Sequence, residues 1–366
     1  MAHPAAPSPV TLAPDPSPGA DAALPPSDLA FVAAHATDVP ALLDRVTRIA
    51  PSLPAPGEGD TVRLWSALAS VAAADVGAAR VLEPHLDALT ILRQAPDGVD
   101  LGLLDAGPAS TWGVYAAEGP GVRVEARPDA AGEGWVLDGT KPWCSLARHL
   151  SHALVTAWVG DERRLFAVAL RTPHVRADEG PWVARGLTQV VSAPVHLDSA
   201  PAVPVGPTGW YLRRPGFAWG GIGVAACWWG GAVGLARSLW SSLQGREAQQ
   251  LALAHLGAVD VALGAARSAL AEAAVLVDGR VDGGLDGGLD DAVAGLTARR
   301  VRTVVADTVE EVQRRCAHAM GPGPLTTDEA FARRVADLGL YVRQHHAERD
   351  QASQGRDLLA RGELPW

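Results

Sequence analysis

The sequence predicts an α+β protein in which helices come first, strands second and helices again last. A length of 366 residues is too great for one compact core and predicts two or three packed units. The hydrophobic fraction of 48% is higher than that of a disordered chain. The spacing of hydrophobic residues changes from three or four to two near position 101, and back after position 215. The wider spacing is typical of helices and the narrower one of strands. This order predicts an N-terminal helical domain at 28–100, a middle domain of antiparallel strands at 101–206 and a C-terminal helical domain at 207–366.

Residues 1–27 are rich in proline and alanine and contain eight prolines. Because proline interrupts helical hydrogen bonding, we expect a disordered tail there, without the basic start and apolar run of a secretory signal. In the following region Leu42, Val46 and Ile49 recur at helical spacing. Prolines near its middle divide the region into at least two helices.

The middle region contains short runs in which hydrophobic residues alternate with polar ones or β-branched residues cluster. Joints rich in glycine, proline and aspartate separate the runs at the spacing of an antiparallel sandwich or barrel. The runs expected to form strands are residues 122–126, 135–138, 153–156, 165–170 and 194–197.

The segment 215–236 contains no charged residue and is long enough to suggest a membrane-spanning helix. Seven of its residues are glycines, and its flanks show no charge asymmetry that would set an orientation. Glycines permit a close approach of helix backbones. We therefore expect a helix buried inside a helical bundle and no membrane span.

Charge and cysteine content exclude several classes of function. The net charge is −10, with 31 basic against 41 acidic residues, whereas broad nucleic-acid binding requires a basic face. The three scattered cysteines form neither a disulfide framework nor a thiolate metal cage. Patterns typical of phosphate-binding loops, serine hydrolases and zinc peptidases are absent from the sequence. We expect a cytoplasmic protein with no metal site.

Two local patterns contain residues suited to chemistry. His345 and His346 are adjacent and lie among charged residues on a predicted helix. They are either part of a polar, ion-paired helix face or a base with a pKa near neutrality. Trp143, Cys144 and Ser145 end a predicted strand, where an indole beside a hydroxyl either binds a planar cofactor or forms an ordinary barrel rim. The residues alone leave both questions open.

Residues 135–145 resemble the middle-domain signature of the acyl-CoA dehydrogenase superfamily, in which a strand leads into Gly-x-Lys-x-Trp and a small or hydroxyl residue. Other stretches are similar to successive parts of the same family, namely residues 112–118, 182–192, 231–236, 317–323 and 333–338. The resemblance covers roughly residues 101 to 356. It implies a middle β-barrel and a C-terminal four-helix bundle.

The resemblance also implies a cofactor site. FAD would lie between the β domain and the C-terminal bundle, and the neighbouring subunit of a homodimer or homotetramer would complete the pocket. The implied contacts are Trp112, Val114, Tyr115, Trp143 and Ser145 around the flavin ring, and Gly321 and Gly323 around the adenosine diphosphate. Lys141, the only lysine of the chain, stands in the Gly-x-Lys-x-Trp pattern, so we expect the flavin-side turn to accept an ammonium stem but not a guanidinium fork.

The activity implied by the resemblance is FAD-dependent α,β-dehydrogenation of an acyl thioester such as an acyl-CoA. Electrons would pass to an acceptor such as an electron-transfer flavoprotein. In the family a glutamate removes the α-proton, but here His345 occupies its usual position, and its second known position falls near Val224. His345 or nearby Glu348 is therefore the candidate base. The family's pyrophosphate-binding pattern Arg-x-x-Phe-Gly is also incomplete after Arg246.

These departures leave two alternatives open. In the first, the chain is a flavin-dependent monooxygenase of the same superfamily, and His345 stabilises the oxygenated flavin. In the second, it is a catalytically degenerate subunit that serves as a structural or binding scaffold.

Overall fold

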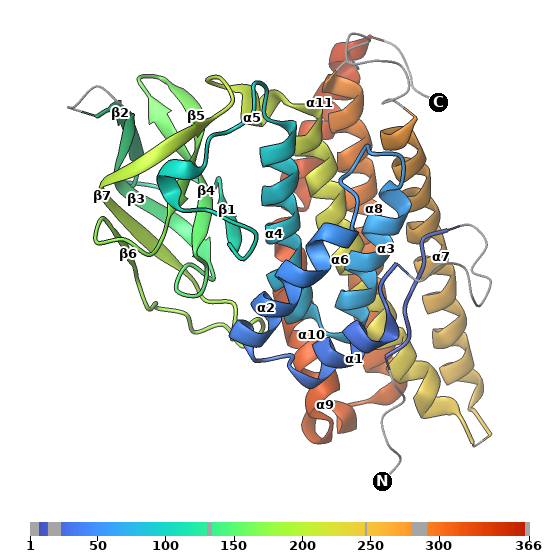
Figure 1. Cartoon of the computed structure of the whole chain (residues 1–366). Coiled ribbons are helices and arrows are strands. Elements are labelled where there is room, and N and C mark those ends of the chain that lie inside the picture. Colours follow the sequence, from blue (N-terminus) through green and yellow to red (C-terminus); the bar gives the residue numbers. More distant parts are fainter. Residues whose placement is uncertain (1–6, 14–22, 130–133, 246, 280–290, 363–366) are drawn as a thin grey trace.

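The computed structural model describes residues 7–13, 23–129, 134–245, 247–279 and 291–362 (Figure 1). The helices of the N-terminal region are α1 (Pro26–Ala34), α2 (Val39–Ile49), α3 (Thr61–Ala74) and α4 (Val76–Gln94), with short 3-10 turns η1 (Ala50–Ser52) and η2 (Gly102–Leu104). Aspartates begin two of these helices. The side chain of Asp38 accepts a hydrogen bond from the first turn of α2, and that of Asp75 does so for α4, which satisfies backbone donors that a helix leaves free.

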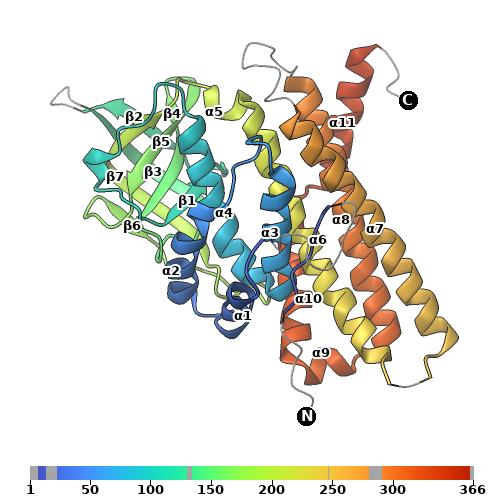
Figure 2. The same cartoon turned by 45° about the vertical axis from the view of Figure 1, so that its right-hand side comes forward.

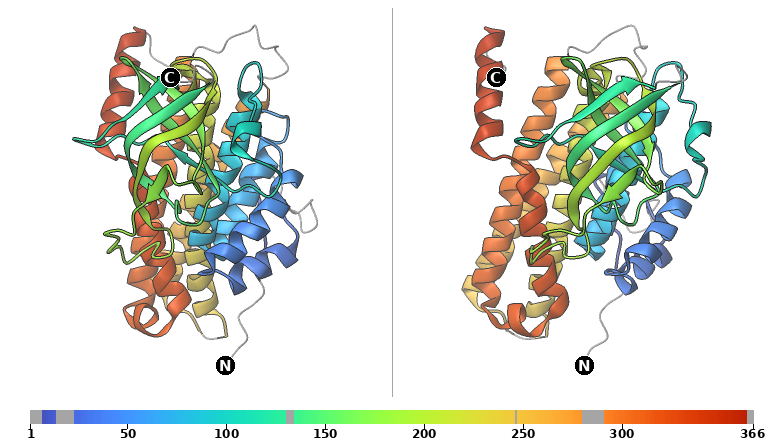
Figure 3. Two further views of the ribbon diagram at one scale, coloured as in Figure 1. Left: turned by 60° about the vertical axis from the view of Figure 1, so that its left-hand side comes forward. Right: turned by 90° about the vertical axis from the view of Figure 1, so that its left-hand side faces the viewer.

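The strands of the described residues form one closed barrel, which comes to the front in both views of Figure 3. They are β1 (Trp112–Tyr115), β2 (Val124–Pro128), β3 (Trp135–Ser145), β4 (His152–Val159), β5 (Glu162–Ala169), β6 (Val175–Ala177) and β7 (Ser192–Val205). The ring runs β4–β2–β3–β7–β5 and returns to β4, while β6 pairs with β7. The sequence predicts antiparallel strands throughout, but β1 and β2 each run parallel to β4. That difference arises from the connections between strands, which alternating hydrophobicity does not encode.

The remaining helices form the larger part of a helical body. They are α5 (Trp210–Arg213), α6 (Pro215–Leu243), α7 (Gln250–Asp278), α8 (Asp291–Met320), α9 (Gly323–Thr327), α10 (Glu329–Tyr341) and α11 (Glu348–Arg361), with the 3-10 turn η3 (Val342–Gln344). The central helix is α6, which packs against α7, α8 and α10, and also against α3 from the N-terminal region. Helices from both ends of the chain thus build one body (Figure 1).

The glycines of α6 allow the close packing that the sequence predicts. A Cβ atom at Gly230 would lie only 2.1 Å from the carbonyl oxygen of Ala69 on α3, so only glycine fits at this crossing. Trp228, two residues earlier, is fully buried. Within the described ranges, none of the helices combines the length and the hydropathy needed to cross a bilayer.

The described part of the proline-rich start packs against α3, in contrast to the predicted disordered tail. The backbone N–H groups of Val10 and Leu12 donate hydrogen bonds to the hydroxyls of Ser70 (2.9 Å) and Ser66 (3.0 Å). Leu12 is fully buried. Residues 1–6 and 14–22 lie outside the described residues. Prolines prevent a helix here, but an extended segment needs no internal hydrogen bonds and can still bury a side chain.

The barrel and the helical body meet along α4 (Figure 2). At one junction the N–H of Trp112 on β1 donates to Nδ1 of the buried His85 on α4 at 3.2 Å. At another, the N–H of Leu187 donates to the buried carboxylate of Asp337 on α10. Next to it, a Cβ at Gly186 would lie 2.0 Å from the carbonyl oxygen of Ala336. These contacts fix the loop before β7 against α10 and leave a space between the two bodies.

Candidate functional site

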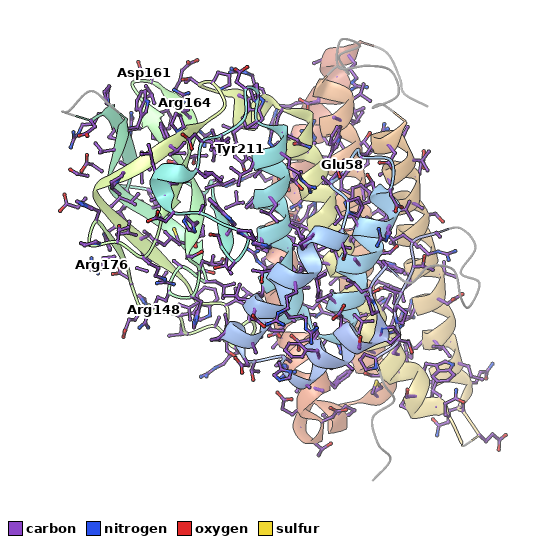
Figure 4. The ribbon with its side chains drawn as sticks, in the orientation of Figure 1. Glu58, Arg148, Asp161, Arg164, Arg176 and Tyr211 are labelled. Carbon is purple, nitrogen blue, oxygen red and sulfur yellow. The ribbon has the colours of Figure 1, made fainter. Side chains whose placement is uncertain are left out.

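A cavity of about 680 Å³ lies between the barrel and the helices. Cofactor and substrate sites typically occupy about 300–1,000 Å³. Its walls come from α4, β1, the end of β3, the loop before β7, α5, α6, α10 and the segment after α10. Tyr211 of α5, labelled in Figure 4, belongs to this wall and lies between the barrel and α4.

The barrel side of the cavity presents an exposed indole and two hydroxyls. The pairing of β3 with β7 shifts between Lys141 and Cys144, and Trp143 at this bulge has a positive φ of 60°. Its side chain is 63% exposed, because the bulge turns it out of the barrel. The hydroxyls of Ser145 and Ser192 are hydrogen-bonded at 2.7 Å. All three of these side chains line the cavity.

The β1 strand adds backbone groups to the same side. Val114 and Tyr115 line the cavity, and β1 stands at the end of the strand order, paired only with β4 among the described strands. An edge strand offers N–H and C=O groups that are free for other partners. The hydroxyl of Tyr115 donates to the carbonyl oxygen of Ser145 at 3.0 Å, which ties β1 to the end of β3.

The helix side of the cavity carries charge. Arg80, Glu83 and Asp87 follow one another along one face of α4 and all line the cavity. The guanidinium of Arg80 donates to Oε2 of Glu83 at 2.9 Å and to the hydroxyl of Ser145 at 3.4 Å. The hydroxyl of Tyr341 on α10 donates to the same Oε2 at 3.4 Å. A chain of polar contacts therefore crosses the cavity wall from Glu83 to the barrel.

Burial perturbs both carboxyl groups. It raises the pKa of Glu83 to about 7, although the neighbouring Arg80 guanidinium opposes the shift. Burial likewise raises the pKa of Asp87, whose closest cation, Arg214, lies 3.9 Å away. A carboxyl that titrates near neutrality on a cavity wall is a candidate for proton transfer.

The histidines predicted as candidate bases separate from each other in the structure. His345 follows η3 and lies outside the helices; it is 8% exposed, and its Nε2 lies 3.2 Å from the hydroxyl of Thr303. Its ring meets the edge of Trp228, with 6.5 Å between ring centroids, and burial lowers its pKa. The neighbouring His346 lines the cavity whereas His345 does not, and Glu348 lies exposed in the first turn of α11.

Other residues implied by the family resemblance are divided between the cavity and the rest of the fold. Val114, Tyr115, Trp143 and Ser145 line the cavity together. Trp112 does not line the cavity and is buried in the contact between the barrel and α4, with its ring 4.7 Å from that of His152. Gly321 and Gly323 lie after α8 and at the start of α9, away from the cavity walls. Arg246 lies outside the described residues.

Sequence reasoning missed the helix side of the site. The signal was present in α4, where Arg80, Glu83 and Asp87 interrupt an otherwise apolar, mostly buried helix at spacings of three and four. Charged residues on a helix face that should be buried require either partners or a cavity. The contact with Tyr341 joins positions 258 residues apart, and no local pattern predicts it.

The residues around the cavity fit a flavin. An isoalloxazine is a flat ring system with an apolar edge and a hydrogen-bonding edge, so it needs aromatic or aliphatic surface together with fixed donors and acceptors. Trp143, Val114 and Val190 supply the apolar surface. The hydroxyls of Ser145 and Ser192 and the free edge of β1 supply the polar groups.

No protein-family model and no curated protein sequence matches this chain. Solved structures do match its fold. The complex of KijD3 with FMN and dTDP-3-amino-2,3,6-trideoxy-4-keto-3-methyl-D-glucose has a TM-score of 0.76 and 19% identity, over 94% of this chain and 95% of that chain. Dibenzothiophene monooxygenase TdsC from Paenibacillus sp. A11-2 has a TM-score of 0.74 and 15% identity, over 93% and 96%. Nitrososynthase from Micromonospora carbonacea var. africana has a TM-score of 0.74 and 20% identity, over 93% and 95%. The chain therefore has the fold of acyl-CoA dehydrogenase-like flavin enzymes.

Proposed function

We propose that this chain is a flavin-dependent monooxygenase that binds FMN in the cavity between the barrel and the helices. The observation that carries the proposal is the agreement of the whole fold with TdsC, a dibenzothiophene monooxygenase, over 93% of this chain. The FMN complexes of KijD3 and TdsC favour FMN over the predicted FAD. The cavity adds independent support, because residues suited to a flavin ring converge on it.

Each side of the cavity has a separate task in the proposed reaction. When bound, the flavin supplies the two-electron chemistry that activates dioxygen. Trp143 and the edge of β1 orient the ring, and the Ser145 and Ser192 hydroxyls bind its polar edge. On the loop side, Trp182 and Leu187 cover the cavity and exclude water from the reacting centre. His346 and Arg343 place a proton donor and a positive charge at the wall that follows α10.

Thioester dehydrogenation has less support than oxygenation. Val224 lines the cavity and offers no carboxylate, and the segment after α10 contributes Arg343, Gln344 and His346. Among the described cavity residues, the carboxyl groups come from α4 instead. The predicted acyl-CoA substrate and electron-transfer flavoprotein belong to that alternative hypothesis. The predicted homo-oligomer follows from the shared cofactor site that the family resemblance implies and is common to both enzyme hypotheses.

The visible spectrum of the purified chain tests the proposal first. We expect FMN to bind and to give a flavin spectrum, with weaker binding of FAD. Reduced FMN, supplied photochemically or by a flavin reductase, should then react with oxygen on the protein. A chain that binds neither flavin would refute both enzyme hypotheses and favour the degenerate scaffold. Anaerobic bleaching of the bound flavin by an acyl-CoA would support the dehydrogenase instead.

A further inference from the structure

One oxygen of the Glu83 carboxylate is left for the cavity. Oε2 accepts the hydrogen bonds from Arg80 and Tyr341. Oε1 has no hydrogen-bond partner among the described residues, although Glu83 as a whole is only 9% exposed and lines the cavity. Oε1 does not belong to the fully enclosed polar atoms that lack a partner, so it faces the open space of the cavity. It is therefore available to accept a hydrogen bond from whatever occupies the cavity.

The groups around Glu83 hold it in place and do not compete for that oxygen. The charged and titratable side chains that face it come from five helices: Arg80 and Asp87 on α4, Tyr211 on α5, Cys227 on α6, Arg302 on α8 and Tyr341 on α10. Burial keeps the pKa of Tyr341 well above its ordinary value and also raises that of Cys227. These two groups stay neutral at physiological pH, so proton exchange falls to the carboxyl groups.

Asp87 extends the acceptor surface by one helical turn. It follows Glu83 by four residues on α4, so both side chains lie on the same face. No hydrogen bond to its carboxylate occurs among the described residues, and the nearest cation, Arg214, stands 3.9 Å from it. The α4 wall thus offers a run of oxygen acceptors, whereas the opposite wall offers hydroxyls, an indole and backbone groups. A ligand suited to the α4 wall carries N–H donors and positive charge.

We propose that Glu83 is the base of this cavity and that it takes a proton from the ammonium group of an amine substrate, an inference that rests on the proposed monooxygenase function. In this step an N–H bond breaks and its electron pair stays on nitrogen, while an O–H bond forms at Oε1 of Glu83. The freed electron pair is the nucleophile that an oxygen-transferring flavin enzyme requires. Sulfur substrates already carry free electron pairs, so an oxygenase specific for sulfur needs no such base.

The electrostatics of the wall suit this transfer. A carboxylate in water has a pKa too low to hold a proton taken from an ammonium group, but burial brings that of Glu83 to about 7. Burial of the amine lowers its pKa in the opposite direction, because desolvation disfavours its charged form as well. The pKa of Glu83 and the pKa of the amine therefore approach each other inside the cavity. Asp87 stabilises the positive charge before the proton moves.

Ligand binding tests the proposal without turnover. Cyclohexylamine and its neutral isostere cyclohexanol are titrated into the FMN-saturated chain by calorimetry between about pH 5.5 and about pH 8.5. Because protonated Glu83 must lose its proton to pair with the ammonium ion, amine affinity should rise about tenfold per pH unit below pH 7 and then level off. Cyclohexanol affinity should not change with pH. Buffers of different ionisation enthalpy should show one proton released per amine bound at low pH.

Matched variants assign the effect to one residue. E83Q should lower amine affinity at least about tenfold at high pH and flatten its pH dependence. D87N should weaken amine binding but keep its dependence on pH. The control is E125Q, at an exposed position of β2, which should behave as wild type. If E83Q fails to fold, E83D keeps the charge beside Arg80 and withdraws the carboxylate by one methylene, and the same loss is expected. Unchanged amine binding in E83Q, or equal pH profiles for amine and alcohol, would overturn the proposal.

The two proposals fail separately. If the chain retains no flavin, the same titration on the flavin-free chain still tests Glu83, and only the oxygenase function is lost. If reduced FMN reacts with oxygen on the protein but amine and alcohol bind alike, the oxygenase stands and the amine inference is wrong. With cyclohexylamine present, a pH profile of oxygen uptake that differs between E83Q and wild type would show that Glu83 acts in the oxygenase reaction.

Discussion

Lys141 is a buried ammonium whose hydrogen-bonding capacity is fully used. The residue is 1% exposed, and its Nζ donates to Glu118 Oε1 at 2.7 Å, to the Thr156 hydroxyl at 2.8 Å and to the Thr156 carbonyl oxygen at 2.9 Å. An ammonium has three donors, so none is left over. Lys141 does not line the cavity. Its slim stem is required by the interior of the barrel, where a guanidinium fork would not fit these three acceptors.

Replacing Lys141 should therefore destabilise the barrel. K141M removes the donor to the Thr156 carbonyl and leaves Glu118 with only the more distant cation Arg163, at 3.9 Å. We expect a loss of about 2 kcal/mol in the free energy of unfolding. The loss is moderated because the Glu118 side chain is 33% exposed. Urea denaturation measures it. R127Q, which breaks an exposed pair with Asp138, is the control and should change stability by less than about 1 kcal/mol.

Trp143 should contribute directly to flavin binding. Its indole lines the cavity although it is 63% exposed, and stacking of aromatic rings contributes about 1 kcal/mol beyond the buried area. W143A should weaken FMN binding about tenfold with little change in stability. Flavin fluorescence titration measures the affinity. Trp240, which is 54% exposed on α6, supplies the control W240A; equal FMN affinity in the two variants would contradict the placement of the flavin.

The sequence predicts part of the site because that part is contiguous. Trp143 and Ser145 stand in one recognisable pattern, and both line the cavity. Of the two adjacent histidines, His346 lines the cavity and His345 is buried beside Trp228, after the 3-10 turn that follows α10. The role of His345 as a base stays a prediction. Glu83 could not be predicted as a cavity residue, because its surroundings form only when α4 meets α10.

The junction between α4 and β1 depends on a neutral histidine. His85 is 2% exposed and accepts the hydrogen bond of the Trp112 N–H at 3.2 Å. Burial lowers its pKa from 6.5 to about 4. The unfolded chain therefore binds more protons than the folded chain between these values. The stability that His85 contributes is complete above about pH 6.5 and is lost as the pH falls through about 4.

This linkage predicts a measurable pH dependence. Between about pH 6.5 and about pH 4, wild type should lose about 3 kcal/mol more free energy of unfolding than H85N. Asparagine retains an acceptor for the Trp112 N–H but does not titrate. Glu83 has a raised pKa and acts in the opposite direction, but it is present in both proteins and cancels in the difference. If the free energies of unfolding of wild type and H85N change equally with pH, in thermal or urea unfolding, His85 is not held in its neutral form by burial.

The arrangement of elements was predictable where it depends on periodicity. The helix–strand–helix order and the burial of α6 follow from the spacing of apolar residues and from glycines such as Gly230. The parallel pairing of β1 with β4 did not follow, because β1 reaches its partner across about forty intervening residues, with Trp112 opposite His152. A pairing between strands so far apart in the chain leaves no pattern in the sequence of either strand.

The N-terminal segment packs against two neighbouring helices of the helical body, α3 and α6. The guanidinium of Arg237 on α6 donates to the carbonyl oxygens of Ser8 at 2.7 Å and Pro9 at 3.2 Å, and Leu12 is buried against the helices. L12A should lower the free energy of unfolding by about 2–3 kcal/mol through loss of buried surface and the cavity left behind. Chemical denaturation measures the change. The control is the 85% exposed Leu359, and a loss in L12A no larger than in L359A would contradict the packing of this segment.

The cavity is assembled from residues that range from Arg80 to His346. The barrel supplies one part of this lining and the helices supply the other, so neither part can hold the ligand after separation. Occupancy of the cavity must then protect distant segments together against proteolysis and hydrogen exchange. At a ligand concentration one hundred times the dissociation constant, this protection amounts to about 2.7 kcal/mol. The visible absorbance of bound flavin would therefore report whether the entire chain is folded.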